Sequence, residues 1–210
     1  MSINLHLGDC LEAMRAMPDN AYELAIVDPP YGIKRDGQTE THTKLKKHKR
    51  KYFKSKGWDK TTPSKHYFNE LKRVSSNQII WGGNYFVQYL EPSMGWVFWD
   101  KGQDLTMSDG ELAYTSFQRA LRRKVINRSQ LLIEGGTIHP TQKPVKLYEW
   151  LLDNYAKEGD RILDTHLGSG SIALACHNRG FSLDAYEIDE EYYNAAKERL
   201  RVHQSQLTIF

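Results

Sequence analysis

The sequence predicts an α/β fold built on a doubly wound, mostly parallel sheet. Apolar segments of strand length alternate with segments of helical periodicity along most of the chain. Near its end, the glycine turn "LGSGS" connects a short apolar strand to a helix. With 210 residues, the chain has the length of a single domain, residues 1–210, that carries a large insertion.

The composition is typical of a globular protein from a reducing compartment. Hydrophobic residues make up 40% of the chain, which supplies a core. Two cysteines, Cys10 and Cys176, are too few for a disulfide framework, and neither has a metal-ligand spacing with histidine. The N-terminal residues lack the pattern of a signal peptide, and no apolar run is long enough to span a bilayer. These observations predict a cytoplasmic protein without a metal site.

The first elements form a strand, a helix and a second strand. "INLHL" (3–7) predicts a strand, and "GDCLEAMRAM" (8–17) predicts a helix that ends at Pro18. "YELAIV" (22–27) is a strand whose continuous apolar end indicates burial on both faces.

Residues 32–65 form a basic insertion without periodicity. Nine cationic side chains between Lys44 and Lys60 face one acid, Asp59, so this stretch carries +8 while the whole chain carries +3. Such a block is either a solvated loop or a contact for a polyanion. Aromatic residues between the lysines suit phosphates and exposed bases. We expect DNA contacts from Lys44, Lys46, Lys47, Lys49, Arg50 and Lys51.

Regular patterns return after the insertion. A helix over 65–74 precedes strands over 77–83, 95–101 and 110–117, and residues 118–136 are basic and ambiguous. Pro144 begins a helix that Gly159 ends. The last third then contains a strand that ends at Asp164, a helix over 171–179 capped by Gly180, a strand over 181–188 and a helix over 189–202 with Asp189 as its N-cap.

Acidic residues follow several predicted strands and indicate a cofactor site. Gly168 and Gly170 let the backbone approach a ligand, and Glu187 stands at a spacing from Asp164 that suits a ribose. Because Asp164 would repel a pyrophosphate, the acids favour a cationic ligand that carries a ribose, such as S-adenosylmethionine. Asp9 either contacts an adenine or caps its own helix; the sequence favours neither.

The stretch "DPPY", Asp28 to Tyr31, suits transfer of a methyl group to an exocyclic amine. The Asp28 carboxylate and the Pro29 carbonyl can each accept one amine hydrogen, and Pro30 stiffens this arrangement. Tyr31 offers a ring on which an extruded base can stack. A cysteine nucleophile for carbon methylation is not indicated, since both cysteines are expected to be packing residues.

Together these segments resemble the amino-directed DNA methyltransferases, which act on adenine N6 or cytosine N4. The catalytic motif "DPPY", the cofactor motif "DTHLGSGS" and the signature "HPTQKP" (139–144) carry the resemblance. The catalytic motif precedes the cofactor motif, as in the permuted beta class. The resemblance implies a Rossmann-like sheet of seven strands with the last strand antiparallel. It also implies a cofactor, S-adenosylmethionine, whose methionine part is surrounded by Thr141, Lys143, Asp164, Gly168 and Gly170. Ser169 is expected at the cofactor as well.

The chain also departs from the family pattern. His166 replaces an aromatic residue near the cofactor, and we assign it no proton transfer. The target-recognition region is reduced to residues 118–136, so specificity is expected in the insertion or in a second subunit, with the protein a monomer or a homodimer. The small size resembles stand-alone enzymes of phages and mobile elements. Aspartate in the catalytic motif favours adenine N6 over cytosine N4.

The alternatives are a methyltransferase for RNA or protein, which the motif order argues against, and an inactive DNA-binding subunit. The final residues "QLTIF" (206–210) resemble the peptide by which bacterial proteins bind the replication sliding clamp. A terminal strand packed on its own domain is the other interpretation of these residues.

Overall fold

The computed structural model describes residues 1–38, 51–102 and 108–207. Within these ranges the strands are β1 (Ile3–Leu7), β2 (Tyr22–Val27), β3 (Ser75–Trp81), β4 (Trp96–Asp100), β5 (Gly110–Thr115), β6 (Arg122–Val125), β7 (Arg161–Asp164) and β8 (Ser182–Glu187). The α-helices are α1 (Cys10–Ala16), α2 (Lys65–Val74), α3 (Gln130–Ile133), α4 (Val145–Tyr155), α5 (Ser171–Arg179) and α6 (Glu190–Leu207). Short 3₁₀ turns span Gly83–Tyr85 and Val87–Tyr89.

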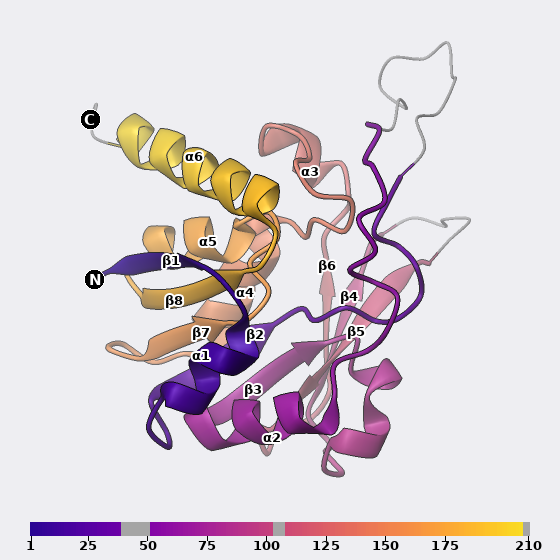
Figure 1. Cartoon of the computed structure of the whole chain (residues 1–210), viewed down its shortest axis with the longest axis vertical. Helices are drawn as coiled ribbons and strands as arrows, with labels where there is room; N and C mark the ends of the chain where they lie inside the picture. The colour runs from indigo at the N-terminus through magenta and orange to yellow at the C-terminus, as the bar shows by residue number, and fades with distance from the viewer. Residues whose placement is uncertain (39–50, 103–107, 208–210) are drawn as a thin grey trace.

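The described strands form one sheet in the order β1-β8-β7-β2-β3-β5-β4-β6 (Figure 1). Helices cover both of its faces, which confirms the predicted α/β architecture. The sheet has eight strands instead of the expected seven. The extra strand, β6, lies in the segment 118–136 and pairs in parallel with β4. Its sequence "RRKV" has no apolar alternation, so the pattern gave no sign of a strand at this edge.

Seven strands run in one direction and β5 runs against them. It pairs antiparallel with β3 on one side and β4 on the other. We expected the last strand to be antiparallel, but the last strand along the chain, β8, pairs in parallel with β1 and β7. That expectation was wrong for the chain order: the antiparallel strand is the fifth of eight.

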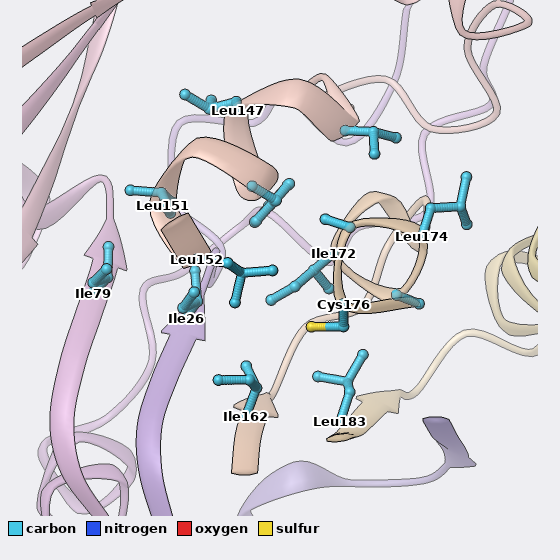
Figure 2. Packing of buried hydrophobic residues seen from close by; sticks show 14 of the residues in the cluster. Ile26, Ile79, Leu147, Leu151, Leu152, Ile162, Ile172, Leu174, Cys176 and Leu183 are labelled. Carbon is cyan, nitrogen blue, oxygen red and sulfur yellow. The ribbon is translucent and has the colours of Figure 1, made fainter. Parts of the chain in front are cut away.

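Two hydrophobic cores lie on opposite faces of the sheet. Leu24 and Ile26 of β2 belong to one core, and Ala25 and Val27 belong to the other. This alternation confirms that β2 is buried on both faces. Figure 2 shows the first core, where α4 and α5 pack on the strands and Cys176 is fully buried. Cys176 is therefore a packing residue, as predicted.

Neighbouring strands bring two acids to the same edge of the sheet. β2 and β7 pair in parallel, with Ala25 opposite Leu163. Asp164 is the last residue of β7, and Asp28 is the first residue after β2. Because the carboxyl ends of parallel strands meet at one edge, both carboxylates lie where doubly wound folds bind their ligands.

Helix ends follow the predicted chemistry with small shifts. Asp189 caps α6 by accepting the Tyr192 N–H at 3.1 Å, and α6 continues to Leu207, past the predicted end at 202. α4 ends at Tyr155, and Gly159 lies in the turn beyond it with a φ of 89°. Gly180 ends α5 in the left-handed region, as predicted.

Two buried carboxylates form hydrogen bonds within the described parts of the basic insertion. Asp59, 2% exposed, accepts the N–H groups of Gly32 and Arg35, each at 2.7 Å. Asp36, 5% exposed, accepts the Ser55 hydroxyl at 2.8 Å and the Gly57 N–H. The described parts of this segment are therefore held together by specific hydrogen bonds, although little regular structure is present.

Some predicted contact residues lie outside the described residues. They are Lys44, Lys46, Lys47, Lys49 and Arg50. Lys51 is described and exposed, with its Nζ over the Phe53 ring. Of the predicted docking tail, Gln206 and Leu207 belong to α6, and residues 208–210 lie outside the described residues. None of the described helices has the length and apolar character needed to cross a membrane.

We expect Asp59→Ala to destabilise the described part of the insertion around Gly32 and Arg35. The substitution leaves two backbone N–H groups without their acceptor, which costs about 1–3 kcal/mol for each buried group left unsatisfied. Amide hydrogen exchange at Gly32 and Arg35 should accelerate, and limited proteolysis should cut within 51–64. Asp153→Ala, which removes an exposed partner of Arg179, is the control. Unchanged exchange in Asp59→Ala would show that the carboxylate does not brace this segment.

Candidate active site

The segment Asp28 to Tyr31 lies at the carboxyl end of β2, and both Asp28 carboxylate oxygens have partners. Tyr31 donates its hydroxyl to Asp28 Oδ1 at 2.6 Å. Lys143 donates its ammonium to Asp28 Oδ2 at 2.5 Å. Pro29, the residue after Asp28, is buried, and its ring restricts the backbone at this point. The carboxylate is thus held in one orientation by a phenol and a cation.

Lys143 is the centre of a buried ionic cluster. Its side chain is 2% exposed and also donates to Glu111 Oε2 at 3.1 Å. Lys101 contacts the other Glu111 oxygen at 3.0 Å. The Trp81 ring lies 5.1 Å from the Lys143 ammonium. We expected Lys143 beside the methionine part of a cofactor, whereas the structure brings it to Asp28 and Glu111.

The cluster sets the pKa values of its members. Burial raises the pKa of Asp28, and the nearby Glu111 charge adds to this, while the Lys143 ammonium opposes it. Burial tends to lower the pKa of Lys143, but the carboxylates of Asp28 and Glu111 outweigh burial and raise it. The ammonium groups of Lys143 and Lys101 outweigh burial of Glu111 and lower its pKa. Lys143 and Glu111 are therefore charged at neutral pH.

The ring of Tyr31 is packed more closely than the sequence predicted. It stacks on Tyr85, with ring centroids 5.0 Å apart and planes 16° apart. Gly82, with a φ of 68°, lies so close that a Cβ there would be 2.2 Å from the Tyr31 ring. We expected an open face for an extruded base on Tyr31. Tyr85, 40% exposed, covers one of its faces in this structure.

The glycine turn and its acids form a second part of the site. Asp164 is buried and accepts the His166 N–H at 3.0 Å. Burial raises the pKa of Asp164 to about 8, with further contributions from the charges of Asp28 and Glu187. Glu187 accepts the Gly168 N–H at 2.8 Å, so it fixes the turn directly. The acids at these strand ends therefore lie close enough to interact, as predicted.

A small cavity of about 160 Å³ opens between the ends of β1, β7 and β8. Asp9, His166 and Glu187 are among the residues that line it. Asp9 Oδ1 accepts the Leu11 N–H at 2.7 Å and caps α1, so the capping interpretation is confirmed. Burial lowers the pKa of His166 to about 4, so its ring is neutral at neutral pH. Burial disfavours the charged form of Cys10 as well, which for a thiol raises the pKa, here to about 12.

Three other predicted cofactor residues, Ser169, Gly170 and Thr141, have different surroundings. Ser169 is buried behind the turn, where its hydroxyl lies 3.1 Å from the Ser171 hydroxyl and its carbonyl accepts from Arg199. Gly170 begins α5 in the left-handed region with a φ of 72°. Thr141 is exposed and lies 3.1 Å from His139 Nδ1. Ser169 can contribute backbone geometry to a ligand site, whereas Thr141 can offer its side chain.

A cavity of about 990 Å³ lies in front of the catalytic segment. Its floor includes Asp28, Pro29, Pro30 and Tyr31, together with Lys143. The described part of the insertion supplies another side of the lining, with Lys34, Arg35, Tyr52, Phe53 and Trp58. Cations and rings on one wall suit phosphates and unstacked bases.

The sequence did not single out Glu111, Lys101, Gly82 or Tyr85. Glu111 is a lone acid inside the strand segment "GELAYTSF", a pattern that indicates a buried partner. The glycine pair of "IIWGGNYF" directly after an apolar strand indicates a close backbone approach. Both signals were present, but the residues that they face come from distant parts of the chain.

The comparisons with known proteins identify the family. The family model described as DNA methylase, N6_N4_Mtase, matches residues 87–198, which is more than half of the chain. The chain belongs to the N6/N4 DNA methylase family. The Type II methyltransferase M.HpaI of Haemophilus parainfluenzae is 24% identical over 95% of this chain and 74% of its own length. The putative methylase YubD of Escherichia coli K12 is 24% identical over 92% of this chain and 88% of its own length.

Solved structures of DNA methylases share the fold. The M1.HpyAVI–SAM complex aligns with a TM-score of 0.63 and 18% identity, over 94% of this chain and 98% of that chain. The cytosine-N4-specific PvuII DNA methyltransferase also aligns with a TM-score of 0.63, at 14% identity, over 95% of this chain and 86% of that chain. At these identities the likeness establishes the fold, and the base specificity of the DNA methylase described here has to be argued from its own residues.

We expect Gly82→Ala to displace the Tyr31 ring. The new Cβ would occupy space that the ring now fills, and the positive φ adds strain of roughly 1 kcal/mol. Gly135→Ala is the matched control, because its φ of 91° is similar but open space surrounds its Cβ position. Near-ultraviolet circular dichroism should change in Gly82→Ala only. Equal spectra for the two variants would contradict the close packing of Tyr31.

We expect Asp164→Asn to flatten the pH dependence of stability. The pKa of Asp164 is about 8 in the folded protein against an ordinary value of 3.8, so the folded state binds the proton more tightly. This contribution to the free energy of unfolding is complete below pH 3.8 and is lost as the pH rises through about 8. Urea unfolding of wild type and Asp164→Asn between pH 5 and 8 measures the difference. Parallel curves would show that the carboxyl does not carry a raised pKa.

Proposed function

We propose that this DNA methylase transfers a methyl group from S-adenosylmethionine to the exocyclic N6 amine of adenine in DNA. Transfer is direct, onto a base swung out of the duplex into the 990 Å³ cavity. The observation that carries the proposal is the position of Asp28. Its carboxylate lies at the floor of this cavity and one strand away from Asp164, which ends β7 just before the glycine turn.

The residues at the ends of β1, β7 and β8 fit S-adenosylmethionine by their chemistry. Glu187 would bind the ribose hydroxyls, and Asp9 has a second carboxylate oxygen for the adenine side. Asp164, with Thr141 and the Gly168–Gly170 turn, would bind the methionine part. A buried carboxyl with a raised pKa becomes more acidic beside a cation, so Asp164 can ionise when an ammonium or sulfonium binds. The cofactor supplies an electrophilic methyl group.

The chain orients the acceptor amine. Asp28 and the Pro29 carbonyl accept the two amine hydrogens, which pulls the nitrogen toward sp3 geometry and frees its lone pair from conjugation with the ring. The lone pair forms the new C–N bond while the electrons of the broken C–S bond remain on sulfur. The nitrogen becomes positively charged in this step and then loses a proton. A carboxylate held beside this developing charge stabilises it.

Support for adenine comes from the motif "DPPY", because aspartate in this motif favours N6 over N4 methylation. N4 methylation of cytosine is the second candidate, since the PvuII structure shows that the fold also occurs in a cytosine-N4-specific enzyme. An RNA methyltransferase or an inactive DNA-binding subunit has less support, because the motif order and the intact acids argue against each.

DNA contacts are proposed for the basic insertion. Its described wall places Lys34, Arg35 and Lys51 with aromatic rings beside or near the cavity. Lys44, Lys46, Lys47, Lys49 and Arg50 would extend this positive surface, with phosphate contacts that fix the duplex in position. Contacts of this kind make binding weaker as the salt concentration rises.

Mass spectrometry of the methylated DNA tests which base receives the methyl group. Purified protein, duplex DNA of mixed sequence and S-adenosylmethionine are incubated, and the DNA is digested to nucleosides. The proposal expects N6-methyl-2′-deoxyadenosine as the product. N4-methylcytosine would select the second candidate, and absence of both products in duplex and single-stranded DNA would overturn the proposal.

We expect Asp28→Ala to abolish methyl transfer, with a fall in rate of roughly 100-fold or more, because the amine loses its charged acceptor. Binding of S-adenosylmethionine, measured by calorimetry, should remain, since the small cavity is formed by other residues. Glu91→Gln, which removes an exposed carboxylate on Lys72, is the control. A fully active Asp28→Ala variant would exclude Asp28 from the reaction.

A further inference from the structure

The carboxylate that should receive the target amine already holds a cation. Lys143 is a hydrogen-bond donor on Asp28 Oδ2, and Tyr31 is a donor on Oδ1. An exocyclic amine is also a donor, so it has to share the carboxylate oxygens with these groups. The amine becomes positive during transfer, and an ammonium on the same oxygen would oppose that charge. The amine therefore needs Lys143 to withdraw.

The structure contains a second position for this ammonium. Glu111 Oε2 lies 3.1 Å from Lys143 Nζ, and Glu111 is fixed by its place on β5. The Trp81 ring supports the cation 5.1 Å away. A small movement of Nζ from Asp28 toward Glu111 exchanges one carboxylate for another. The charge stays paired throughout, so the withdrawal avoids the cost of an uncompensated buried ion.

We propose that Lys143 occupies the place of the target amine on Asp28 in the base-free enzyme, and that Glu111 is the positioning residue that receives its ammonium when the base arrives. This inference rests on the proposed function and adds two residues to it. Lys143 thereby keeps the carboxylate paired between turnovers, and Glu111 leaves Asp28 unopposed during methyl transfer.

The charges around Asp28 make this exchange favourable for transfer. Asp28 faces Lys143 and Tyr31 directly, with Glu111 on β5 and Asp164 on β7 nearby. With Lys143 on Asp28, the positive charge of the ammonium offsets the negative charge of the oxygen that meets the amine. With Lys143 on Glu111, Asp28 presents its full charge to the nitrogen as that nitrogen becomes positive. Lys101 holds the outer Glu111 oxygen, so Glu111 keeps its orientation during the exchange.

Glu111→Gln tests the role of the second position. The neutral amide holds an ammonium weakly, so Lys143 stays on Asp28 and competes with the amine. We expect kcat to fall roughly 10- to 100-fold, a loss on the scale of removing one preorganised electrostatic group. Removal of the Glu111 charge also lowers the pKa of Asp28, so the acid limb of the pH–rate profile should move to lower pH. KM for S-adenosylmethionine should stay within about twofold. The reason is that the loss of an interaction made only in the transition state lowers kcat and leaves KM unchanged.

Glu111→Asp and Glu91→Gln are the comparison variants. Glu111→Asp keeps the negative charge, so we expect it to retain the wild-type acid limb and to recover most of kcat. Glu91→Gln removes an exposed acid and should match wild type. Urea unfolding shows whether each variant is folded, and if Glu111→Gln is unfolded, the kcat and acid limb of Glu111→Asp decide the question.

Three results would overturn the proposal. They are an unchanged kcat in Glu111→Gln, a lower kcat with an unmoved acid limb, and a Glu111→Asp variant as slow as Glu111→Gln. A wild-type enzyme that methylates neither adenine nor cytosine would instead refute the proposed function. The two failures are distinguishable because the variants are compared only after wild-type activity is established.

Discussion

The candidate active site depends on burying charged groups at one edge of the sheet without leaving any of them unpaired. Moving a single ion out of water costs several kcal/mol unless a partner compensates it. Asp28 and Glu111 share Lys143, and Lys101 completes the set, so two acids are balanced by two bases. This balance explains why the segment "HPTQKP" has to reach across to β2 and β5. The cluster connects the catalytic segment to the half of the sheet that borders the insertion.

The parallel sheet turns this balance into a reactive arrangement. Its register brings Asp28, just after β2, beside Asp164 at the end of β7, and the Asp28 charge adds to the effect of burial in raising the pKa of Asp164. Asp164 has no cationic side chain on it comparable with Lys143, so its pKa rises to about 8. The two acids therefore meet different needs. The Lys143 ammonium opposes the effect of burial on Asp28, whereas Asp164 can pair with a cation brought by a ligand.

Much of this arrangement could be predicted from the sequence because it depends on local patterns. The strand "YELAIV", the turn with Gly168 and Gly170, and the acids after the strands each follow from composition and spacing over a few residues. Lys143, Glu111 and Tyr85 could not be assigned in this way. Their contacts join segments far apart in the chain, and a single sequence carries no direct record of which distant side chains meet. β6 was missed for a different reason, because an exposed basic edge strand has no hydrophobic alternation.

The cavity wall is a second place, besides the aspartate of the motif on the floor, where a choice between adenine and cytosine can arise. In the proposed reaction, Asp28 and the Pro29 carbonyl accept amine hydrogens, and both bases offer such an amine. Neighbours at a TM-score of 0.63 include a cytosine-N4-specific enzyme, so the framework itself does not select the base. The bases differ in size and in their ring acceptors, which side chains of the wall can contact. In this structure that wall includes Tyr85 and the rings of the insertion, which is braced through Asp36 and Asp59. Residues that fix the insertion are therefore expected to influence base choice together with the residues that touch the reacting nitrogen.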